Sequence, residues 1–390
     1  MNTKRIMFVF GTRPEAVKLA PVIGATREST NFEAFVVVTA QHRSMLDQVN
    51  EFFGIAPDAD LGVMRAGQTL ASLTGRTMRG LDALMTRHRP DAVVVQGDTT
   101  STLVGALTAF YRRIPVVHVE AGLRTFDRHA PFPEEINRQL TTRLTDLHLA
   151  PTPGCRQNLL DEQVAAADIE VTGNTVIDAL HWAIRQHSPY GIDALEALDE
   201  QPGKVLLVTA HRRESWGAPM HAIGRALARI AMAEPRLTIV LPMHMNPAVR
   251  ATLLPLLLEQ PNVLVTPPLP YGAFCRLMQR STLVLTDSGG LQEEAPALGK
   301  PVLVMRDTTE RPEAVAGGNA RLVGTEERRI VAAVRLLLHD EDAYAAMARA
   351  INPYGDGHAA TRTVGALGRF FARSVDRPAA VAAGLDLSSR

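Results

Sequence analysis

The stretch RIMFVFGTRPEAVKLA, residues 5–20, contains the unit that is repeated along this chain. Residues 5–10 form a short apolar run, and the polar segment Gly11-Thr12-Arg13-Pro14-Glu15 follows it directly. Pro14 suits the first position of a helix, where its missing N–H leaves no bond unmade and its fixed φ is already helical. The stretch therefore predicts a buried strand, a polar loop and the start of a helix.

Similar apolar runs continue along the chain, and stretches of helical period separate them. The predicted strands cover residues 5–10, 34–39, 92–96, 116–119, 147–150, 169–171, 205–209, 237–241, 263–266, 283–286 and 302–305. The predicted helices include residues 71–87, 99–112, 134–144, 176–186, 220–233 and 247–259. Strands that are apolar on both faces and alternate with helices are typical of parallel sheets covered by helices. We therefore predict an α/β fold with two doubly wound, Rossmann-like domains that face each other across a cleft.

The alternation of strands and helices pauses between Asn174 and Gly203, where Pro and Gly residues predict a connection between domains. We expect an N-terminal domain over residues 1–173 and a C-terminal domain over residues 174–358. The last helix, residues 359–375, is expected to return to the first domain. Residues 376–390 are expected to form a flexible tail.

The composition excludes several classes of protein. The 390 residues carry 41 basic and 41 acidic side chains, which argues against nucleic acid or a membrane surface as a partner held by charge. The two cysteines, Cys155 and Cys275, make no disulfide framework, and this fits a reduced, cytoplasmic compartment. Because no apolar run approaches the roughly 20 residues of a membrane helix, we expect a soluble protein.

Polar clusters follow nearly every predicted strand. In an open parallel sheet, ligands bind just beyond the carboxyl ends of the strands. Because such clusters occur in both predicted domains, we expect a ligand in the cleft between them. The clusters lie at residues 11–15, 41–43, 97–99, 120–124, 173–174, 211–214, 244–247, 287–290 and 308–311.

Asp287-Ser288-Gly289-Gly290 precedes a predicted helix over residues 291–298. A helix N-terminus offers free N–H groups and positive potential, and glycines let a phosphate approach the backbone. The alternative is an ordinary helix cap, with Glu293 and Glu294 in the first turn. The paired glycines and the downstream Arg311 favour a diphosphate site. Gly11-Thr12-Arg13-Pro14 suggests the same arrangement after the first strand. The sequence has neither G-x-G-x-x-G nor a Walker lysine loop, which argues against a dinucleotide or ATP cofactor.

Three carboxylates, Asp98, Glu120 and Glu134, lie at or just beyond predicted strand ends. Taken singly, each is more typical of a helix cap or a solvated charge, and Glu134 can pair with Arg138 at i,i+4 spacing. Glu135 must point about 100° away from Glu134, so that only one of them can face a given ligand.

His211 and His244 each end a predicted strand of the second domain, beside arginines in the first case and Asn246 in the second. A structural hydrogen bond is the alternative role for such a histidine. Three carboxylates together with His211 suit a reaction that needs several acid/base groups. No spacing of His, Asp or Glu resembles a metal-ligand set, so we expect no metal.

These motifs, in this order, resemble the non-hydrolysing UDP-N-acetylglucosamine 2-epimerases. The resemblance covers about residues 4–375 and rests on segments 8–15, 95–100, 119–125, 133–138, 173–175, 209–214, 244–247, 287–296, 306–313 and 352–357. It implies two domains like those of the GT-B glycosyltransferases, the second of them binding UDP. It also implies a homodimer and no nicotinamide cofactor.

The activity implied by the resemblance is inversion of C2 of UDP-N-acetylglucosamine to give UDP-N-acetylmannosamine for bacterial surface polysaccharides. UDP is eliminated to leave a bound glycal and then adds back. The implied catalytic residues are Asp98, Glu120, Glu134 and His211. The implied substrate-binding residues are Arg13, Lys18, Arg138, Asn174, His244, Phe274, Ser288, Gly289, Gly290, Glu294 and Arg311. The candidates for a regulatory site are Gln41, His42, Arg43 and Arg212.

The sequence departs from the family pattern at a few positions. Members regulated by their own substrate carry Glu or Gln at the position of Ser44, and some carry Arg at the position of Gly67. Residues 126–130 also differ from relatives, so that loop contacts to the sugar can differ. The alternatives are a hydrolysing epimerase, an epimerase of a modified UDP-sugar, a GT-B glycosyltransferase and a non-catalytic UDP-sugar sensor.

Overall fold

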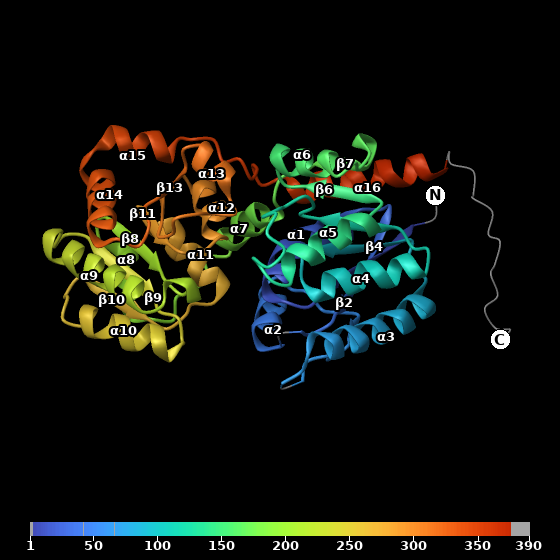
Figure 1. The fold of residues 1–390 in the computed structure, drawn as a ribbon, viewed down its shortest axis with the longest axis horizontal. Coiled ribbons are helices and arrows are strands. Elements are labelled where there is room, and N and C mark those ends of the chain that lie inside the picture. The colour runs from blue at the N-terminus through green and yellow to red at the C-terminus, as the bar shows by residue number, and fades with distance from the viewer. Residues whose placement is uncertain (1–2, 42, 66, 376–390) are drawn as a thin grey trace.

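Two parallel sheets form the framework of the molecule and lie side by side in Figure 1. The computed structural model describes residues 3–41, 43–65 and 67–375. The first sheet contains β1 (Lys4–Phe10), β2 (Phe32–Val38), β3 (Ala59–Asp60), β4 (Ala92–Gln96), β5 (Val116–Val119), β6 (Leu147–Ala150) and β7 (Ile169–Val171). The second contains β8 (Val205–Thr209), β9 (Thr238–Pro242), β10 (Val263–Thr266), β11 (Leu283–Thr286), β12 (Val302–Val304) and β13 (Ala320–Leu322).

Both sheets have the doubly wound strand order. The first is ordered β3-β2-β1-β4-β5-β6-β7 and the second β10-β9-β8-β11-β12-β13, with parallel pairing throughout the described ladders. The direction of winding reverses between β1 and β4 and again between β8 and β11, which is where ligands bind in such sheets. The predicted α/β fold with two Rossmann-like domains of the GT-B type is confirmed.

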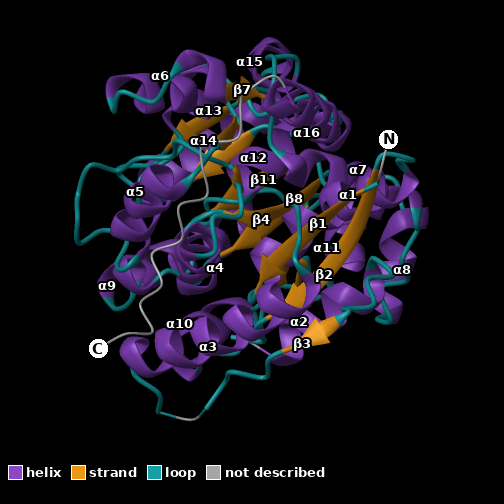
Figure 2. Cartoon of the chain, turned by 90° about the vertical axis from the view of Figure 1, so that its right-hand side faces the viewer, coloured by secondary structure: helices purple, strands orange, loops and turns teal. Residues whose placement is uncertain are grey.

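Helices cover both faces of the strands, as Figure 2 shows. In the first half they are α1 (Arg13–Glu28), α2 (Arg43–Phe52), α3 (Leu70–His88), α4 (Thr100–Tyr111), α5 (Glu134–Leu144), α6 (Pro153–Asp161), α7 (Thr175–Arg185) and α8 (Asp193–Glu200). In the second half they are α9 (Ala218–Ala233), α10 (Pro247–Leu257), α11 (Tyr271–Arg280), α12 (Leu291–Glu294), α13 (Pro312–Ala316), α14 (Glu327–His339), α15 (Glu341–Ala348) and α16 (Ala359–Val375). Short 3-10 turns occur at Ala166–Asp168, Arg213–Ser215 and Ala295–Leu298.

One apolar cluster is shared by the two domains. It includes Phe8 and Ile23 in the first domain and Leu207 and Cys275 in the second, all with at most 1% of their surface exposed. Because α7 packs against α1 on one side and against α11 and α12 on the other, it carries this cluster from one sheet to the next. The two sheets are therefore joined by packed side chains as well as by the connecting chain.

The C-terminal helix α16 packs against α1 of the first domain and against α7, the helix that follows the first sheet, and Figure 1 shows it beside β6 and β7. Its Leu367 is fully buried, its Phe371 ring lies 6.0 Å from that of Phe32, and its Arg369 pairs with Glu170. The domain boundaries after residues 173 and 358 remain a prediction. The tail expected at residues 376–390 lies outside the described residues.

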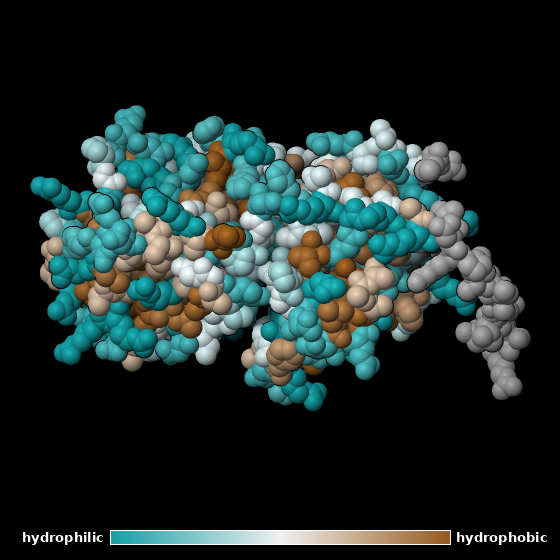
Figure 3. Space-filling model, turned by 90° about the horizontal axis from the view of Figure 1, so that it is seen from above, coloured by the Kyte–Doolittle hydropathy of each residue, from teal (hydrophilic) through white to brown (hydrophobic). Residues whose placement is uncertain are grey.

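The surface is predominantly polar on the face seen in Figure 3, where hydrophobic residues form small separate groups. A hollow separates the two domains on this face. Within the described part of the chain, every helix is too short or too polar to span a bilayer.

Candidate active site

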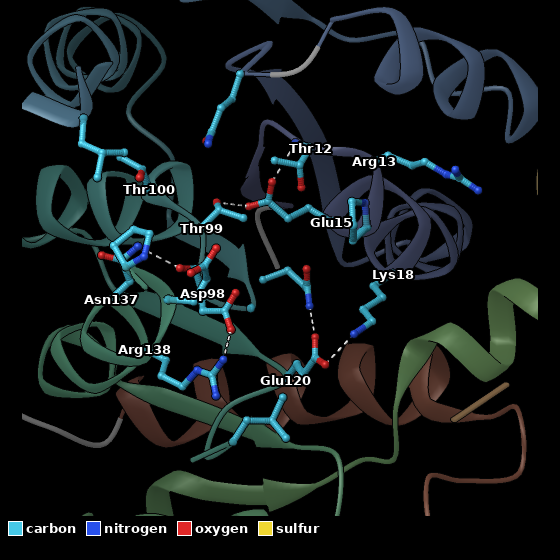
Figure 4. Close-up of a pocket in the computed structure, with 18 of the residues that line it drawn as sticks. Thr12, Arg13, Glu15, Lys18, Asp98, Thr99, Thr100, Glu120, Asn137 and Arg138 are labelled. Carbon is cyan, nitrogen blue, oxygen red and sulfur yellow. Dashed lines mark hydrogen bonds and ion pairs between the residues drawn. The ribbon is translucent and has the colours of Figure 1, made fainter. Parts of the chain in front are cut away.

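A cavity of about 580 Å³ lies beyond the carboxyl ends of β1, β4 and β5 (Figure 4). Most of its walls come from the first domain, and Arg311 enters from the second. The predicted site residues that line it are Arg13, Lys18, Gln41, Asp98, Glu120, Glu134, Arg138 and Arg311. Loops that are far apart in the sequence therefore meet at one place, as the strand-end pattern predicts.

Glu120 and Lys18 form an ion pair in the wall of the cavity. The Glu120 side chain is 5% exposed, it also accepts a hydrogen bond from Gln96, and its backbone has φ +65°. Burial raises the pKa of Glu120, although Lys18 acts in the opposite direction. Burial alone would lower the pKa of Lys18, but the carboxylates of Glu120 and of Glu293 at 3.7 Å raise it. Lys18 therefore remains a cation between two acids from different domains.

Asp98 is held from two directions by α5. Arg138 pairs with its carboxylate, and the Asn137 side chain donates to its backbone carbonyl at 2.9 Å. The Asp98 side chain is 25% exposed and borders the cavity. One carboxylate oxygen is therefore fixed by a guanidinium while the group stays accessible to a ligand.

Glu134 and Glu135 have different surroundings, as the helical spacing predicts. Glu134 lines the cavity, whereas Glu135 is buried and accepts hydrogen bonds from both the backbone N–H and the hydroxyl of Thr125 at 3.0 Å. The expected pairing of Glu134 with Arg138 is wrong. Among the described ion pairs, Arg138 joins Asp98 and Glu135, because its side chain points toward β4. Glu134 is left facing the cavity.

The loop after β1 does not provide the phosphate site expected from Gly11-Thr12-Arg13-Pro14. The N–H groups of Gly11 and Thr12 already donate to the Glu15 carboxylate, at 2.9 and 2.7 Å. Pro14 is the second residue of α1 rather than the first. The side chain of Arg13 extends away from Asp98 and Glu120 in Figure 4, and its charge offsets part of the rise that burial causes in the pKa of Glu294 in the second domain.

Arg311 is the centre of a second cluster of charges. Its Nε lies 2.8 Å from Glu293, and its guanidinium is 3.7 Å from Glu310, which Arg212 approaches at 3.1 Å. A Cβ on Gly289 would lie 3.4 Å from a carboxylate oxygen of Glu310, 3.5 Å from the Arg311 guanidinium carbon and 3.6 Å from an Arg212 nitrogen. Two arginines therefore border the Gly289 backbone, as an anion site in this loop requires.

The continuous helix expected over residues 291–298 is wrong. Only Leu291–Glu294 is α-helical, and a 3-10 turn at Ala295–Leu298 follows, because Pro296 has no N–H for the helical ladder. Glu293 and Glu294 are also not caps. Glu293 pairs with Arg311, and Glu294 accepts a hydrogen bond from the Tyr271 hydroxyl at 2.9 Å. The argument for an anion site here thus rests on the arginines and not on a helix terminus.

His211 lies outside the lining of this cavity, in a second group at the end of β8. Its Nδ1 is 3.0 Å from the buried Asp287, whose carboxylate also accepts the N–H groups of His211 and Arg212. Burial opposes ionisation of Asp287, but these bonds prevail and lower its pKa. The exposed His244 stacks on His211 with 5.9 Å between ring centroids, and its Nδ1 accepts the N–H of Asn246. Asp287 therefore orients His211 with a negative charge.

Comparison with known proteins identifies the family. The family model described as UDP-N-acetylglucosamine 2-epimerase matches residues 24–368. The chain belongs to this family. It is 52% identical to UDP-N-acetylglucosamine 2-epimerase of Escherichia coli K12, over 93% of this chain and 98% of the relative. The Salmonella typhimurium enzyme is 51% identical, with the same coverage. The Neisseria meningitidis UDP-GlcNAc 2-epimerase, solved with UDP-GlcNAc bound, superposes with a TM-score of 0.85 at 44% identity, covering 94% of this chain and 100% of that one.

Other residues selected from the epimerase motifs lie between the domains. Asn174 caps α7 by accepting the N–H of Val176, and it donates to Glu293 at 3.1 Å, so that both ends of its amide are occupied. Phe274 is half-buried against the shared apolar cluster. Ser288 and Gly290 are half-buried in the loop beside the two arginines.

The described candidates for a regulatory site do not lie together: only Gln41 lines the cavity. Gln41 lines the cavity, and its side-chain oxygen accepts a hydrogen bond of 3.0 Å from the Ser101 hydroxyl. Arg43 is exposed and pairs with Asp47 and Asp60. His42 lies outside the described residues. Arg212 belongs to the Arg311 cluster. The assignment of these four residues to a regulatory site remains a prediction.

Glu294 predicts a measurable pH dependence of stability. Burial raises the pKa of Glu294 to about 7, and the charge of Glu293 adds to this effect. Because the pKa in the folded state exceeds the unfolded value of 4.5, this contribution to stability is fully present below pH 4.5 and is lost as pH rises from there to about 7. Over this pH range, the free energy of unfolding of Glu294→Gln should decrease by about 3 kcal/mol less than that of the wild type. Urea unfolding at several pH values checks it, with surface Glu33→Gln as control. Parallel curves for wild type and Glu294→Gln would contradict it.

Sequence reasoning did not select Glu15, Gln96 or Glu310 as site residues. A signal for Glu15 was present, since Thr12-Arg13-Pro14-Glu15 has the spacing of a capping box. Gln96 and Glu310 lie in the quoted motifs, but no local pattern shows that they contact Glu120 and Arg212. Among the described residues, no group of three or more His, Cys, Asp or Glu side chains is arranged to hold a metal ion.

Proposed function

We propose that this chain interconverts UDP-N-acetylglucosamine and UDP-N-acetylmannosamine by a non-hydrolysing elimination and re-addition of UDP. The observation that carries the proposal is the convergence of Asp98, Glu120 and Glu134 on one cavity that Arg311 closes from the other domain. Its relatives support the substrate. The Neisseria meningitidis and Methanocaldococcus jannaschii epimerases were both solved with UDP-GlcNAc bound.

The first step requires cations at the leaving group. The bond between C1 and the diphosphate oxygen breaks, and its electron pair leaves with UDP. Arg311 and Arg212 border the Gly289 loop, and Lys18 lies between the two domains. Positive groups that are already oriented by Glu293 and Glu310 stabilise the developing negative charge without reorganisation.

The second requirement is proton transfer at C2. Loss of the C2 proton to a base forms the C1=C2 double bond of the glycal, and re-addition of UDP with protonation on the opposite face completes the inversion. Asp98, Glu120 and Glu134 supply the carboxylates for proton transfer and for the positive charge that develops at C1. Burial raises the pKa of Glu120, which suits a group that accepts and returns a proton near neutral pH. His211, oriented by Asp287, is the fourth candidate.

Incubation with UDP-N-acetylglucosamine in deuterium oxide tests the reaction. We expect deuterium at C2 of both epimers, because the abstracted proton exchanges with solvent before it is returned. Free N-acetylmannosamine with UDP would instead identify the hydrolysing alternative. A parallel assay with modified UDP-N-acetyl sugars identifies the preferred substrate, and transfer of the sugar to an acceptor would identify a glycosyltransferase.

The assembly and cellular role are part of the same proposal. We propose a cytoplasmic homodimer that supplies UDP-N-acetylmannosamine for surface polysaccharides, with domains at residues 1–173 and 174–358. Phe110 and Tyr111 on α4 and Leu140 on the adjacent α5 are 54%, 66% and 49% exposed. Exposed apolar side chains on neighbouring helices support a protein contact on this face.

A further inference from the structure

The Glu15 carboxylate connects two loops of the candidate active site. Glu15 is 1% exposed, and its Oε2 accepts the N–H groups of Gly11 and Thr12 from the loop after β1. Its Oε1 lies 2.6 Å from the Thr99 hydroxyl and 2.9 Å from the Thr102 hydroxyl at the start of α4. Figure 4 shows Glu15 between Thr12 and Thr99. Glu15 therefore links the loop that carries Arg13 to the loop that carries Asp98.

The hydrogen bonds around Oε1 need more protons than the hydroxyl groups supply. The Thr102 oxygen is 2.9 Å from Glu15 Oε1 and 2.7 Å from the carbonyl oxygen of Gln96, which only accepts. A threonine hydroxyl has one proton to donate. Four oxygen–oxygen contacts therefore share two hydroxyl protons: Thr99 to Glu15, Glu15 to Thr102, Thr102 to Gln96, and Thr99 to Thr102 at 3.1 Å.

A proton on Glu15 supplies the three shorter of these four contacts and leaves the longest, between Thr99 and Thr102, without one. Thr102 then donates to the Gln96 carbonyl, Glu15 donates to Thr102, and Thr99 donates to Glu15. If Glu15 were ionised, one of the three shorter contacts would also have no proton between its two oxygens. This contact would be either the one from Glu15 to Thr102 or the one from Thr102 to Gln96. The unprotonated Oε2 is the natural acceptor for the two backbone N–H groups.

The electrostatic surroundings agree with the proton count. Within residues 3–41, 43–65 and 67–375, no basic side chain forms an ion pair with Glu15, whereas Glu120 pairs with Lys18 and Glu293 with Arg311. Burial raises the pKa of Glu15, and the hydrogen bonds from Thr99 and the loop offset only part of this. A buried carboxyl without a cation is favoured in its neutral form.

We propose that Glu15 is a neutral carboxylic acid in the folded enzyme. It is a positioning residue that holds the loop of Arg13 and the loop of Asp98 in a fixed position relative to each other. Its effect on turnover rests on the function proposed for Asp98. A neutral Glu15 joins the loops without adding a negative charge to a cavity that must accept an anionic diphosphate. Burial similarly keeps the carboxylic acids of some other enzymes protonated, so that they can donate a hydrogen bond.

Glu15→Gln tests the role of the proton, because glutamine matches the neutral acid in shape. Its oxygen accepts both backbone N–H groups, and its amide donates to the threonine hydroxyls. We expect kcat and KM of Glu15→Gln within about threefold of wild type. Glu15→Ala leaves the two N–H groups without a partner and should lower kcat about 100-fold, with a smaller change in KM, because the loops lose their alignment. A glutamine variant that is as slow as the alanine variant, or that does not fold, would overturn the proposal.

A spectroscopic measurement tests protonation independently of turnover. The infrared spectrum of the wild-type protein at pH 8 should contain a protonated-carboxyl C=O band that is missing from Glu15→Gln. The matched control is Glu135→Gln, because hydrogen bonds from Thr125 and its neighbours outweigh burial and lower the pKa of Glu135. That variant should keep the band. Identical spectra of wild type and Glu15→Gln would overturn the neutral acid even if the enzyme is active. If the wild-type protein shows the band but has no epimerase activity, the neutral form of Glu15 is upheld and the proposed function is refuted.

Discussion

Glu120→Gln should lower the turnover number about 10²–10⁴-fold while the affinity for UDP stays nearly unchanged. Glutamine keeps the shape of the side chain and its contact with Gln96, but it removes the negative charge and the proton affinity. Asp98→Asn and Glu134→Gln should have effects of the same size, because we propose that these groups also act in the transition state. His211→Asn should resemble them, with some loss of UDP affinity if the imidazolium faces the phosphates.

Initial rates of epimerisation and calorimetric titration with UDP measure the two quantities separately. Glu162→Gln is the matched control, because Glu162, like Asp98, pairs with a buried arginine but lies outside the cavity. Glu162→Gln should lose stability and keep its turnover. If the turnover numbers of all three cavity carboxylate variants stay within threefold of the wild-type value, none of these carboxylates acts in the proposed elimination. A slow variant that releases free glycal would place the missing group in the re-addition step.

Arg311→Ala should weaken UDP binding by about 1.5–3 kcal/mol, as expected for the loss of a charge-assisted hydrogen bond. The same change should also lower the free energy of unfolding by about 3–5 kcal/mol. The reason is that Glu293, whose side chain is 1% exposed, loses the guanidinium 2.8 Å away and stays buried with Lys18, at 3.7 Å, as its remaining cation, which places the loss toward the lower end of this range. Calorimetry with UDP and urea unfolding measure these two losses.

A second substitution separates binding from stability. Glu293→Gln added to Arg311→Ala removes the buried charge and should restore part of the stability without restoring UDP affinity. Arg225→Ala is the control, because Arg225 pairs with Glu327 on the surface with 54% of its side chain exposed, and such pairs contribute about 0–1 kcal/mol. Unchanged UDP affinity in Arg311→Ala would remove Arg311 from the diphosphate site.

Most of the framework could be predicted from the sequence, because buried parallel strands are continuous apolar runs. The bounds predicted for β4, β5 and β8 agree with the structure, for example. The edge strands β3 and β13 were missed, because they contain only two and three residues and include the polar Asp60 and Arg321. Local patterns also failed at Pro296, where the helix changes to a 3-10 turn.

The sequence could predict which loops form the site, but not which side chains form ion pairs with one another in it. The strand-end rule brings Asp98 and Glu120 to one cavity without reference to their partners. Lys18 is 102 positions from Glu120, and Arg138 is 40 positions from Asp98, so no helical or strand periodicity relates them. Spacing along α5 instead suggested a pair between Glu134 and Arg138, which the tertiary contact with Asp98 replaces.

The position of α16 has a consequence for how the protein is made. Helix α16 is the last described element to be synthesised, yet its buried Leu367 and its Phe371 pack on the domain that is synthesised first. Domains generally fold as units during synthesis, beginning at the N-terminus. Here the N-terminal domain stays incomplete on the ribosome until the whole C-terminal domain has been translated. A stop codon before residue 359 would therefore damage the first domain and leave the sheet of the second intact.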